Sequence, residues 1–188
     1  MDFLKKKTFG YKERNEKIRE KYELLLKEIP KEKRVYIDET GIDDNEVSEY
    51  GWGLIGERVF DMKRGEKTKR YSVVSGLLNN QITAPFVFEG TCCRELFEHF
   101  LEKVLLPIIP IGSVLIMDNA SFHKGGKIKD FIKNAGCKLL YLPAYSPDLN
   151  PIEHHWARVK QIIKKHLVGP VKDFYELAIT AFDEILSY

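Results

Sequence analysis

The chain has 188 residues, 44% of them hydrophobic and 12% aromatic, which is enough for one packed domain with a short appendage. The formal net charge is only +2, and the absence of any run of about 18 apolar residues excludes a membrane span. The first residues are too charged for a secretory signal, and three cysteines, two of them adjacent, give neither zinc spacing nor a disulfide framework. These features predict a protein of the reducing cytoplasm.

The first part of the chain predicts a charged helix and then a strand. Residues 11–29 carry apolar residues at helical spacing and end at Pro30, so residues 1–33 form either a helical arm or linker, or a helix that caps the core. A short strand at 35–38 is expected to end before an acidic loop at 42–50. The folded domain is therefore predicted to span residues 34–188.

Three further strands are predicted, at residues 50–60, 71–78 and 82–88. The first contains a turn near Gly56. Asn79 and Asn80 predict a tight turn between the other two strands. Pro85 requires an edge position or a bulge, because proline cannot donate a hydrogen bond to a neighbouring strand.

The rest of the chain alternates helices and strands. Helices are predicted at 92–106, 124–134, 150–167 and 170–188, with strands at 113–117 and 137–142. Thr91 is expected to cap the first of these helices. The strand at 113–117 is apolar throughout, which indicates a central strand parallel to a neighbour. Antiparallel strands followed by strand–helix–strand units predict an α/β fold with a mixed five-stranded sheet flanked by helices, an order found in the ribonuclease H-like fold.

Carboxylates follow two of the apolar strands and open a helix. Asp38 and Asp118 each end a strand, and Glu153 begins the basic helix. If the two strands are parallel neighbours, their carboxylates project from one edge of the sheet. Hard divalent cations prefer such oxygen ligands. Two ions roughly 3.5–4 Å apart can activate the attacking oxygen and stabilise the leaving oxygen of a phosphodiester, so no side-chain nucleophile is required.

Each carboxylate also has a structural interpretation. Asp38 and Asp118 are residue types that form turns or caps after strands. Glu153 lies three residues after Asn150, which is close to the spacing of a capping box. Asp148 belongs to a Ser-Pro-Asp turn and is not counted as a ligand. The chemical interpretation depends on the three acids together.

Three motifs carry a family resemblance: YIDETG around Asp38, MDNASFH around Asp118, and SPDLNPIEHHW around Glu153. Together they resemble the catalytic domain of mariner-like transposases, especially bacterial insertion-sequence members, and 34 residues separate the last two acids as in that branch. The resemblance implies a ribonuclease H-like fold, these three acids as metal ligands, and two Mg²⁺ or Mn²⁺ ions. It also implies cleavage and strand transfer at transposon ends.

Full-length members of that family carry N-terminal helix–turn–helix domains, for which 33 residues are too few. The chain is therefore expected to be a catalytic part: either one half of a split transposase, whose DNA-binding half is encoded separately, or a truncated or isolated piece of a longer one. The resemblance further implies a homodimer that binds double-stranded transposon ends and target DNA. It implies a prokaryotic cytoplasm as the location, with association to the nucleoid.

Residues near the three acids are candidate auxiliaries. Asn119, His123 and His154 lie next to the acids in sequence. His123 could touch phosphate or position the attacking water, or simply hydrogen-bond within its loop. Trp156 is expected in the core rather than stacked on a base. The basic residues expected to contact the DNA backbone are Arg158, Lys160, Lys164 and Lys165.

Two other functions remain open from the sequence. The same fold could serve a hydrolytic nuclease without strand transfer, which would give no joined product from a pre-cut end. It could also serve a non-catalytic DNA-binding or assembly protein, which would bind DNA without divalent metal.

Overall fold

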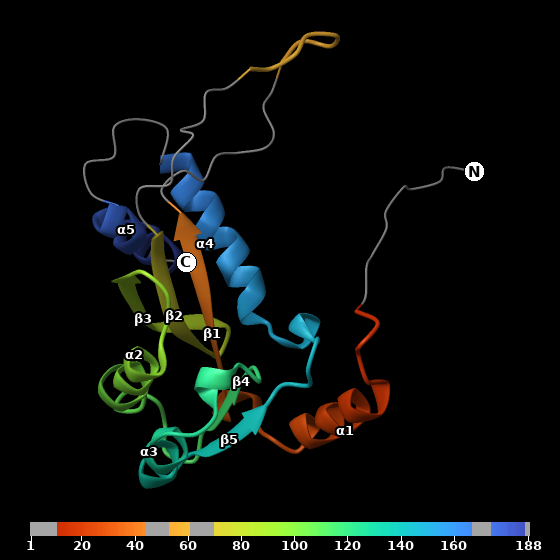
Figure 1. The fold of residues 1–188 in the computed structure, drawn as a ribbon, viewed down its shortest axis with the longest axis vertical. Coiled ribbons are helices and arrows are strands. Elements are labelled where there is room, and N and C mark those ends of the chain that lie inside the picture. Colours follow the sequence, from red (N-terminus) through yellow and green to blue (C-terminus); the bar gives the residue numbers. More distant parts are fainter. Residues whose placement is uncertain (1–10, 44–52, 61–69, 167–173, 187–188) are drawn as a thin grey trace.

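The computed structural model describes residues 11–43, 53–60, 70–166 and 174–186 (Figure 1). In this part the strands are β1 (Arg34–Asp43), β2 (Arg70–Leu78), β3 (Gln81–Glu89), β4 (Val114–Met117) and β5 (Lys138–Tyr141). The α-helices are α1 (Glu16–Lys27), α2 (Arg94–His99), α3 (Ile128–Asn134), α4 (Ile152–His166) and α5 (Phe174–Leu186). None of the described helices is both long and apolar enough to cross a membrane.

The five strands form one mixed sheet in the order β3-β2-β1-β4-β5. The first three pair antiparallel, whereas β4 is parallel to both β1 and β5. All four residues of β4 are buried, as expected for a strand covered on both faces. The predicted mixed five-stranded sheet, with 113–117 as its parallel inner strand, is confirmed.

The parallel register of β1 and β4 aligns the two aspartates. Tyr36 pairs with Ile116, and Asp38 and Asp118 each follow two residues later along their strands. Asp118 therefore directly follows the carboxyl end of β4, the edge where α/β sheets place ligands, and Asp38 lies beside it within β1. The prediction that Asp38 ends its strand was wrong, because β1 continues to Asp43. The two aspartates are aligned because each follows an apolar run and the two runs pair in parallel.

The hairpin between β2 and β3 forms as predicted. Asn79 and Asn80 both adopt left-handed backbone angles, with φ of 52° and 63°, which suits a two-residue hairpin turn. Strand β3 lies at the edge of the sheet, and its register with β2 shifts between Val74 and Gly76. Pro85 lies opposite that shift, so the expectation of an edge strand with a bulge is confirmed.

Strand β1 is longer than the prediction of 35–38. Thr40 pairs with Val73 and Ile42 with Tyr71, so the strand continues to Asp43. Burial of Ile42 against the helices, with 1% of its surface exposed, explains the extension. The prediction of an acidic loop was therefore wrong at its first two residues, and the remainder, 44–50, lies outside the described residues.

The predicted strand at 50–60 is wrong over the described residues 53–60. These residues form no strand, although the predicted turn at Gly56 is present with φ of 91°. Leu54, Ile55 and Phe60 are largely exposed, so their apolar character is not satisfied by a sheet. Residues 50–52 lie outside the described part of the chain.

Three helices begin later than predicted. Helix α2 starts at Arg94 after Cys93, not after Thr91, and continues as a π-helical segment to Leu105. Helix α3 begins at Ile128, because Gly125 and Gly126 before it have positive φ. Helix α4 begins at Ile152 rather than at residue 150. The helix predicted at 170–188 is present as α5 over its described part.

Helices cover both faces of the sheet. Val35 and Ile37 face α2, its π-helical extension and α3, whereas Tyr36 and Ile42 face the opposite side. Helices α4 and α5 pack on that side over β1, β2 and β3, with α4 running alongside β1 (Figure 1). Successive side chains of a strand point to opposite faces of the sheet, so Asp38, which follows Ile37, points to the face covered by α4.

Helix α1 covers β4 and β5 on the same side as α4. Its Tyr22 is 4% exposed and packs in a cluster with Val114, Ile116 and Leu142. Arg34, at the start of β1, donates to backbone carbonyl oxygens at the end of α1. The described part of the N-terminal segment thus contacts the sheet, and the division of the chain at residue 33 stays a prediction.

Candidate active site

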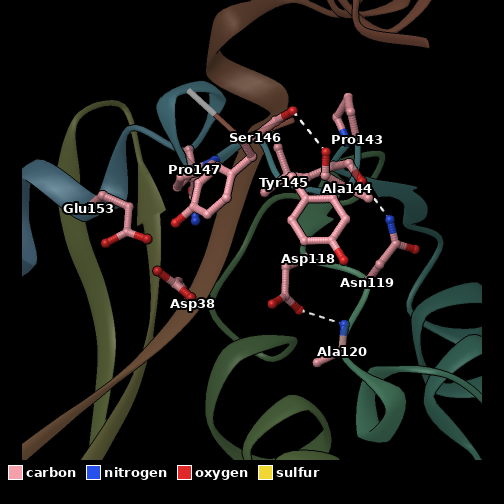
Figure 2. Close-up of a pocket in the computed structure, with 13 residues that line it drawn as sticks. Asp38, Asp118, Asn119, Ala120, Pro143, Ala144, Tyr145, Ser146, Pro147 and Glu153 are labelled. Carbon is pink, nitrogen blue, oxygen red and sulfur yellow. Dashed lines mark hydrogen bonds between the residues drawn. The ribbon is translucent and has the colours of Figure 1, made fainter. Parts of the chain in front are cut away.

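One pocket at the carboxyl edge of the sheet brings the three predicted acids together (Figure 2). Its volume is about 530 Å³. Asp38 comes from β1, Asp118 follows β4, and Glu153 lies in the first turn of α4. In Figure 2 the three carboxylates point toward a shared space, with Asp38 between the other two.

Asp38 is the most strongly perturbed of the three acids. Burial, the neighbouring charge of Glu153 and, less strongly, that of Asp118 together raise its pKa from 3.8 to about 7. A hydrogen bond of 3.1 Å from Trp156 Nε1 to Asp38 Oδ2 opposes this rise. Desolvation and like charge both disfavour the carboxylate, so the site gathers more negative charge than it can neutralise with its own residues.

Asp118 has the opposite electrostatic environment. A 2.6 Å contact with His123 Nδ1 lowers its pKa, helped by the backbone N–H of Ala120 at 2.9 Å. Both contacts use Oδ1, so Oδ2 is not committed to either. Asp118 is therefore held as a carboxylate in a fixed orientation.

His123 is buried, with 2% of its surface exposed. Its ring lies between Phe97 and Phe122, with centroid distances of 4.2 and 4.3 Å. The hydroxyl group of Tyr141 donates to its backbone oxygen at 2.8 Å. Of the roles considered from sequence, hydrogen bonding within the loop is the one the structure shows, and the bond goes to Asp118.

Glu153 is exposed at the mouth of the pocket and does not form the capping box suggested by its spacing. The Asn150 N–H donates to Pro147 O at 2.9 Å instead of to the glutamate. Asn150 Oδ1 is buried without a hydrogen-bond partner, so it does not accept the Glu153 N–H either. The carboxylate of Glu153 is thus not used for capping.

The three acids are not close enough together to surround one metal ion. Among the described residues, no group of three or more His, Cys, Asp or Glu side chains is placed so that it could hold one metal ion. The pairwise electrostatic interactions of Asp38 with Glu153 and with Asp118 are nevertheless strong enough to shift its pKa. Asp38 is therefore the acid that interacts electrostatically with each of the other two.

The predicted auxiliary residues have different positions. Asn119 lines the pocket, and its Nδ2 donates to Leu142 O at 2.6 Å, which ties the loop after β4 to the end of β5. His154 is exposed and is not among the residues that line the pocket. The following residue, His155, faces away from the acids and lies 3.4 Å from Asn80 Oδ1.

The predicted DNA-binding residues of α4 are only partly described. Arg158 is exposed and lines a separate polar pocket of about 320 Å³ with His155 and the β2–β3 turn. Lys160 is half-buried. Lys164 and Lys165 lie in α4, but their side chains are outside the described part of the structure.

Residues from the N-terminal segment complete the pocket, and sequence reasoning missed them. Tyr11 lines it beside Tyr145. Arg19, only 5% exposed, donates two hydrogen bonds to the carboxylate of Asp148, at 2.7 and 3.1 Å. The apolar stripe predicted for helix α1 included Tyr22, which is buried, and Ile18, which is exposed, but not Arg19. The only hint in the sequence was the turn predicted at Asp148, whose carboxylate is the group that Arg19 binds.

Comparison with known proteins gives transposases that match part of this chain. The Transposable element Tcb1 transposase of Caenorhabditis briggsae is 33% identical over 79 residues, which cover 40% of this chain and 29% of the relative. The Tc3 transposase of Caenorhabditis elegans is 44% identical over 46 residues, 24% of this chain and 14% of the relative. The matched part of this chain thus spans less than a third of each of these transposases.

Solved structures share the fold at low sequence identity. The chain superposes on the Mos1 strand transfer complex with a TM-score of 0.73 and 18% identity, over 99% of this chain and 58% of that one. For the mariner Mos1 paired-end complex with Mg, the TM-score is 0.64 and the identity 16%, over 99% and 66% of the two chains. The ribonuclease H-like arrangement predicted from the order of elements is confirmed.

The family follows from the extent of the sequence match. Residues 33–175 match the model that describes the DDE superfamily endonucleases, and this range contains the whole sheet, α2 to α4 and the three acids of the pocket. Since the match covers well over half of the chain, this protein belongs to the DDE superfamily of endonucleases.

Proposed function

We propose that this chain is the catalytic unit of a DNA transposase, which cleaves phosphodiester bonds at transposon ends and transfers the cut strand to target DNA. The observation that carries the proposal is the convergence of Asp38, Asp118 and Glu153 on one pocket. A site that raises the pKa of Asp38 through burial and like charge is a site that favours a bound cation. Membership of the DDE superfamily supports the same chemistry.

The donor atoms fit Mg²⁺ or Mn²⁺, because all three side chains offer carboxylate oxygens and such ions use only one or two carboxylates each. Asp38 interacts electrostatically with both other acids, so we infer that it is shared between two ions. Asp118 would complete one pair and Glu153 the other. Bound there, the ions would activate an attacking oxygen and stabilise the leaving oxygen. His123 and Trp156 would hold Asp118 and Asp38 in orientation.

The substrates and partners follow from the relatives. Mos1 has been solved as a strand transfer complex and as a paired-end complex with Mg or Mn. For this chain we infer double-stranded transposon ends and target DNA as substrates. A homodimer follows from the need to pair two ends, and a separately encoded N-terminal half would recognise them. Arg158, Lys160, Lys164 and Lys165 are the proposed contacts to the DNA backbone, and a prokaryotic cytoplasm stays the predicted location.

A titration with Mn²⁺, measured by isothermal calorimetry, tests the metal site. We expect the wild type to bind Mn²⁺ and Glu153→Gln to bind it about 10- to 100-fold more weakly, the usual cost of perturbing a ligand environment. Glu20→Gln, an exposed acid on α1, is the matched control and should bind as the wild type does. Unchanged affinity in Glu153→Gln would remove Glu153 from the ligand set.

A pre-cut DNA end separates transposition from the two alternatives. With Mn²⁺ and plasmid, joining of the 3′ end to the plasmid supports strand transfer. Nicking without joined product would indicate a hydrolytic nuclease. DNA binding without either product, and without Mn²⁺ binding, would indicate a non-catalytic assembly protein.

A further inference from the structure

The three acids account for only one side of the catalytic pocket. The opposite wall consists of apolar and aromatic side chains: Tyr11, Leu142, Pro143, Ala144, Tyr145 and Pro147. At about 530 Å³, the pocket falls in the range of about 300–1,000 Å³ that holds a small organic molecule. The pocket therefore has room and an apolar surface for more than a phosphate group.

Two tyrosines form the outer part of this wall. The ring centroids of Tyr11 and Tyr145 are 5.8 Å apart, and the ring planes are inclined by 40°. They lie 134 positions apart in the sequence, yet both line the pocket. Their exposed fractions are 57% and 53%, so about half of each side chain meets solvent. Exposed aromatic surface beside a site for phosphate chemistry offers a face to a ligand.

The backbone at Tyr145 is held in an unfavourable conformation. Its φ is 56°, in the left-handed region that bulky residues rarely adopt and that costs of order 1–3 kcal/mol. Ser146 Oγ donates to Ala144 O at 3.1 Å, and Asp148 is anchored by Arg19, so both sides of Tyr145 are fixed. Figure 2 shows the Tyr145 ring on the pocket wall above Asp118. The strained backbone thus presents an aromatic ring to the pocket.

We propose that Tyr11 and Tyr145 form a stacking site for one unstacked base of the DNA strand whose phosphate lies at the carboxylates. The proposal rests on the proposed function, since it requires DNA in the pocket. Among the described residues that line the pocket there is no Lys or Arg, so this wall suits an uncharged base rather than a phosphate. Stacking on an aromatic ring tolerates any base and needs a base outside the duplex stack.

The probe is a fluorescein-labelled DNA duplex with a three-nucleotide 3′ overhang, measured by anisotropy in Ca²⁺. Each overhang base is replaced in turn by an abasic site. In the wild type we expect one replacement to weaken binding about 10-fold. In Tyr145→Gly the same replacement should have no effect, because the ring is gone. Glycine accepts the positive φ, so this variant keeps the backbone of the wall.

Two further variants make the test decisive. Tyr145→Phe retains an aromatic face and should keep the base dependence, whereas Tyr11→Ala should reduce it. Base dependence that persists in Tyr145→Gly, or its absence from the wild type at all three positions, would overturn the stacking site. Those results leave Mn²⁺ binding and strand joining untouched, so failure of the stacking site is distinguishable from failure of the proposed function.

Discussion

Trp156 Nε1 donates a hydrogen bond to Asp38 Oδ2 across 3.1 Å, which links the packed face of α4 to the central carboxylate of the pocket. The indole ring is 3% exposed and meets Phe182 of α5 edge to face. The sequence predicted a core position for Trp156, and that prediction is confirmed. The bond to Asp38 adds a second role, because the position of α4 now determines the orientation of a proposed metal ligand.

Substitution Trp156→Phe removes this donor while most of the aromatic packing remains. Hydrogen bonds to charged groups contribute about 1.5–3 kcal/mol, and those to neutral groups about 0.5–1.5 kcal/mol. We therefore expect a larger loss of unfolding free energy at pH 8, where Asp38 is ionised, than at pH 5, where it is protonated. Urea denaturation at both pH values measures the difference. Ile163→Val on the same helix is the packing control, and its loss should not depend on pH.

The raised pKa of Asp38 predicts that the metal-free protein loses stability as the pH rises. Between pH 3.8 and about 7 the folded state holds a proton on Asp38 that the unfolded chain has released. Stability from this group is thus present at low pH and declines through that window. Asp38→Asn should melt at a higher temperature than wild type at pH 8 in chelator, and close to it at pH 5.

The same variant has a metal-dependent control. Mg²⁺ should raise the melting temperature of the wild type, because it binds only the folded state, and should have little effect on Asp38→Asn. Thermal melts at pH 8 with and without Mg²⁺ provide the comparison. A lower melting temperature for Asp38→Asn in chelator at pH 8 would show that the ionised carboxylate stabilises the fold.

The sequence indicated the carboxylate positions in part, because Asp118 follows β4 and Glu153 lies in the first turn of α4. The apolar runs before Asp38 and Asp118 predict two strands, and the parallel pairing of Tyr36 with Ile116, which the sequence left as a condition, aligns the two acids. A helix start before Glu153 was equally local. The part of the site predictable from sequence is therefore the part encoded by periodicity.

The local partner of Asp118, His123, was among the candidates from sequence, whereas the partners of Asp38 and Asp148 were not predictable because they come from distant segments. Trp156 lies 118 positions from Asp38, and Arg19 lies 129 positions from Asp148. The false strand at 50–60 has the same origin. Aromatic and aliphatic residues there satisfy strand propensity, but over 53–60 no pairing strand is described, and propensity without a partner does not form a sheet.

Arg19→Ala should loosen α1 from the wall of the pocket. It removes two hydrogen bonds to Asp148 and leaves that carboxylate without its main partner. Asp148 is half exposed, so solvent screening limits the loss to about 1–2 kcal/mol. Lys21→Ala, on the exposed side of α1, is the control and should change the unfolding free energy by less than about 0.5 kcal/mol.

The loss in Arg19→Ala should depend on pH. Arg19 lowers the pKa of Asp148 below 3.8, so the ion pair stabilises the fold above that value and the contribution is lost as the pH falls through the lowered pKa. Guanidinium denaturation would screen the pair, so urea is the suitable denaturant. An equal loss at pH 7 and at pH 2 would assign the effect to packing instead of charge.

His123 should control both the orientation and the protonation of Asp118. His123→Phe keeps a ring between Phe97 and Phe122 but removes the donor, whereas His123→Asn can place an amide N–H near the position of Nδ1. Since the contact with His123 lowers the pKa of Asp118, its loss should raise that pKa and move the acidic limb of the cleavage–pH profile to higher pH.

The two His123 variants separate this role from packing. We expect DNA cleavage to fall about 10- to 100-fold in His123→Phe, the usual effect of losing a group that orients a metal ligand. His123→Asn should recover part of the activity and return the acidic limb toward its wild-type position, although it fills less of the space between the phenylalanines. If cleavage by His123→Phe falls but the acidic limb of its remaining activity stays in place, His123 does not set the pKa of Asp118 and acts through packing alone. If His123→Phe cleaves as the wild type does, the orientation of Asp118 comes from the Ala120 N–H instead.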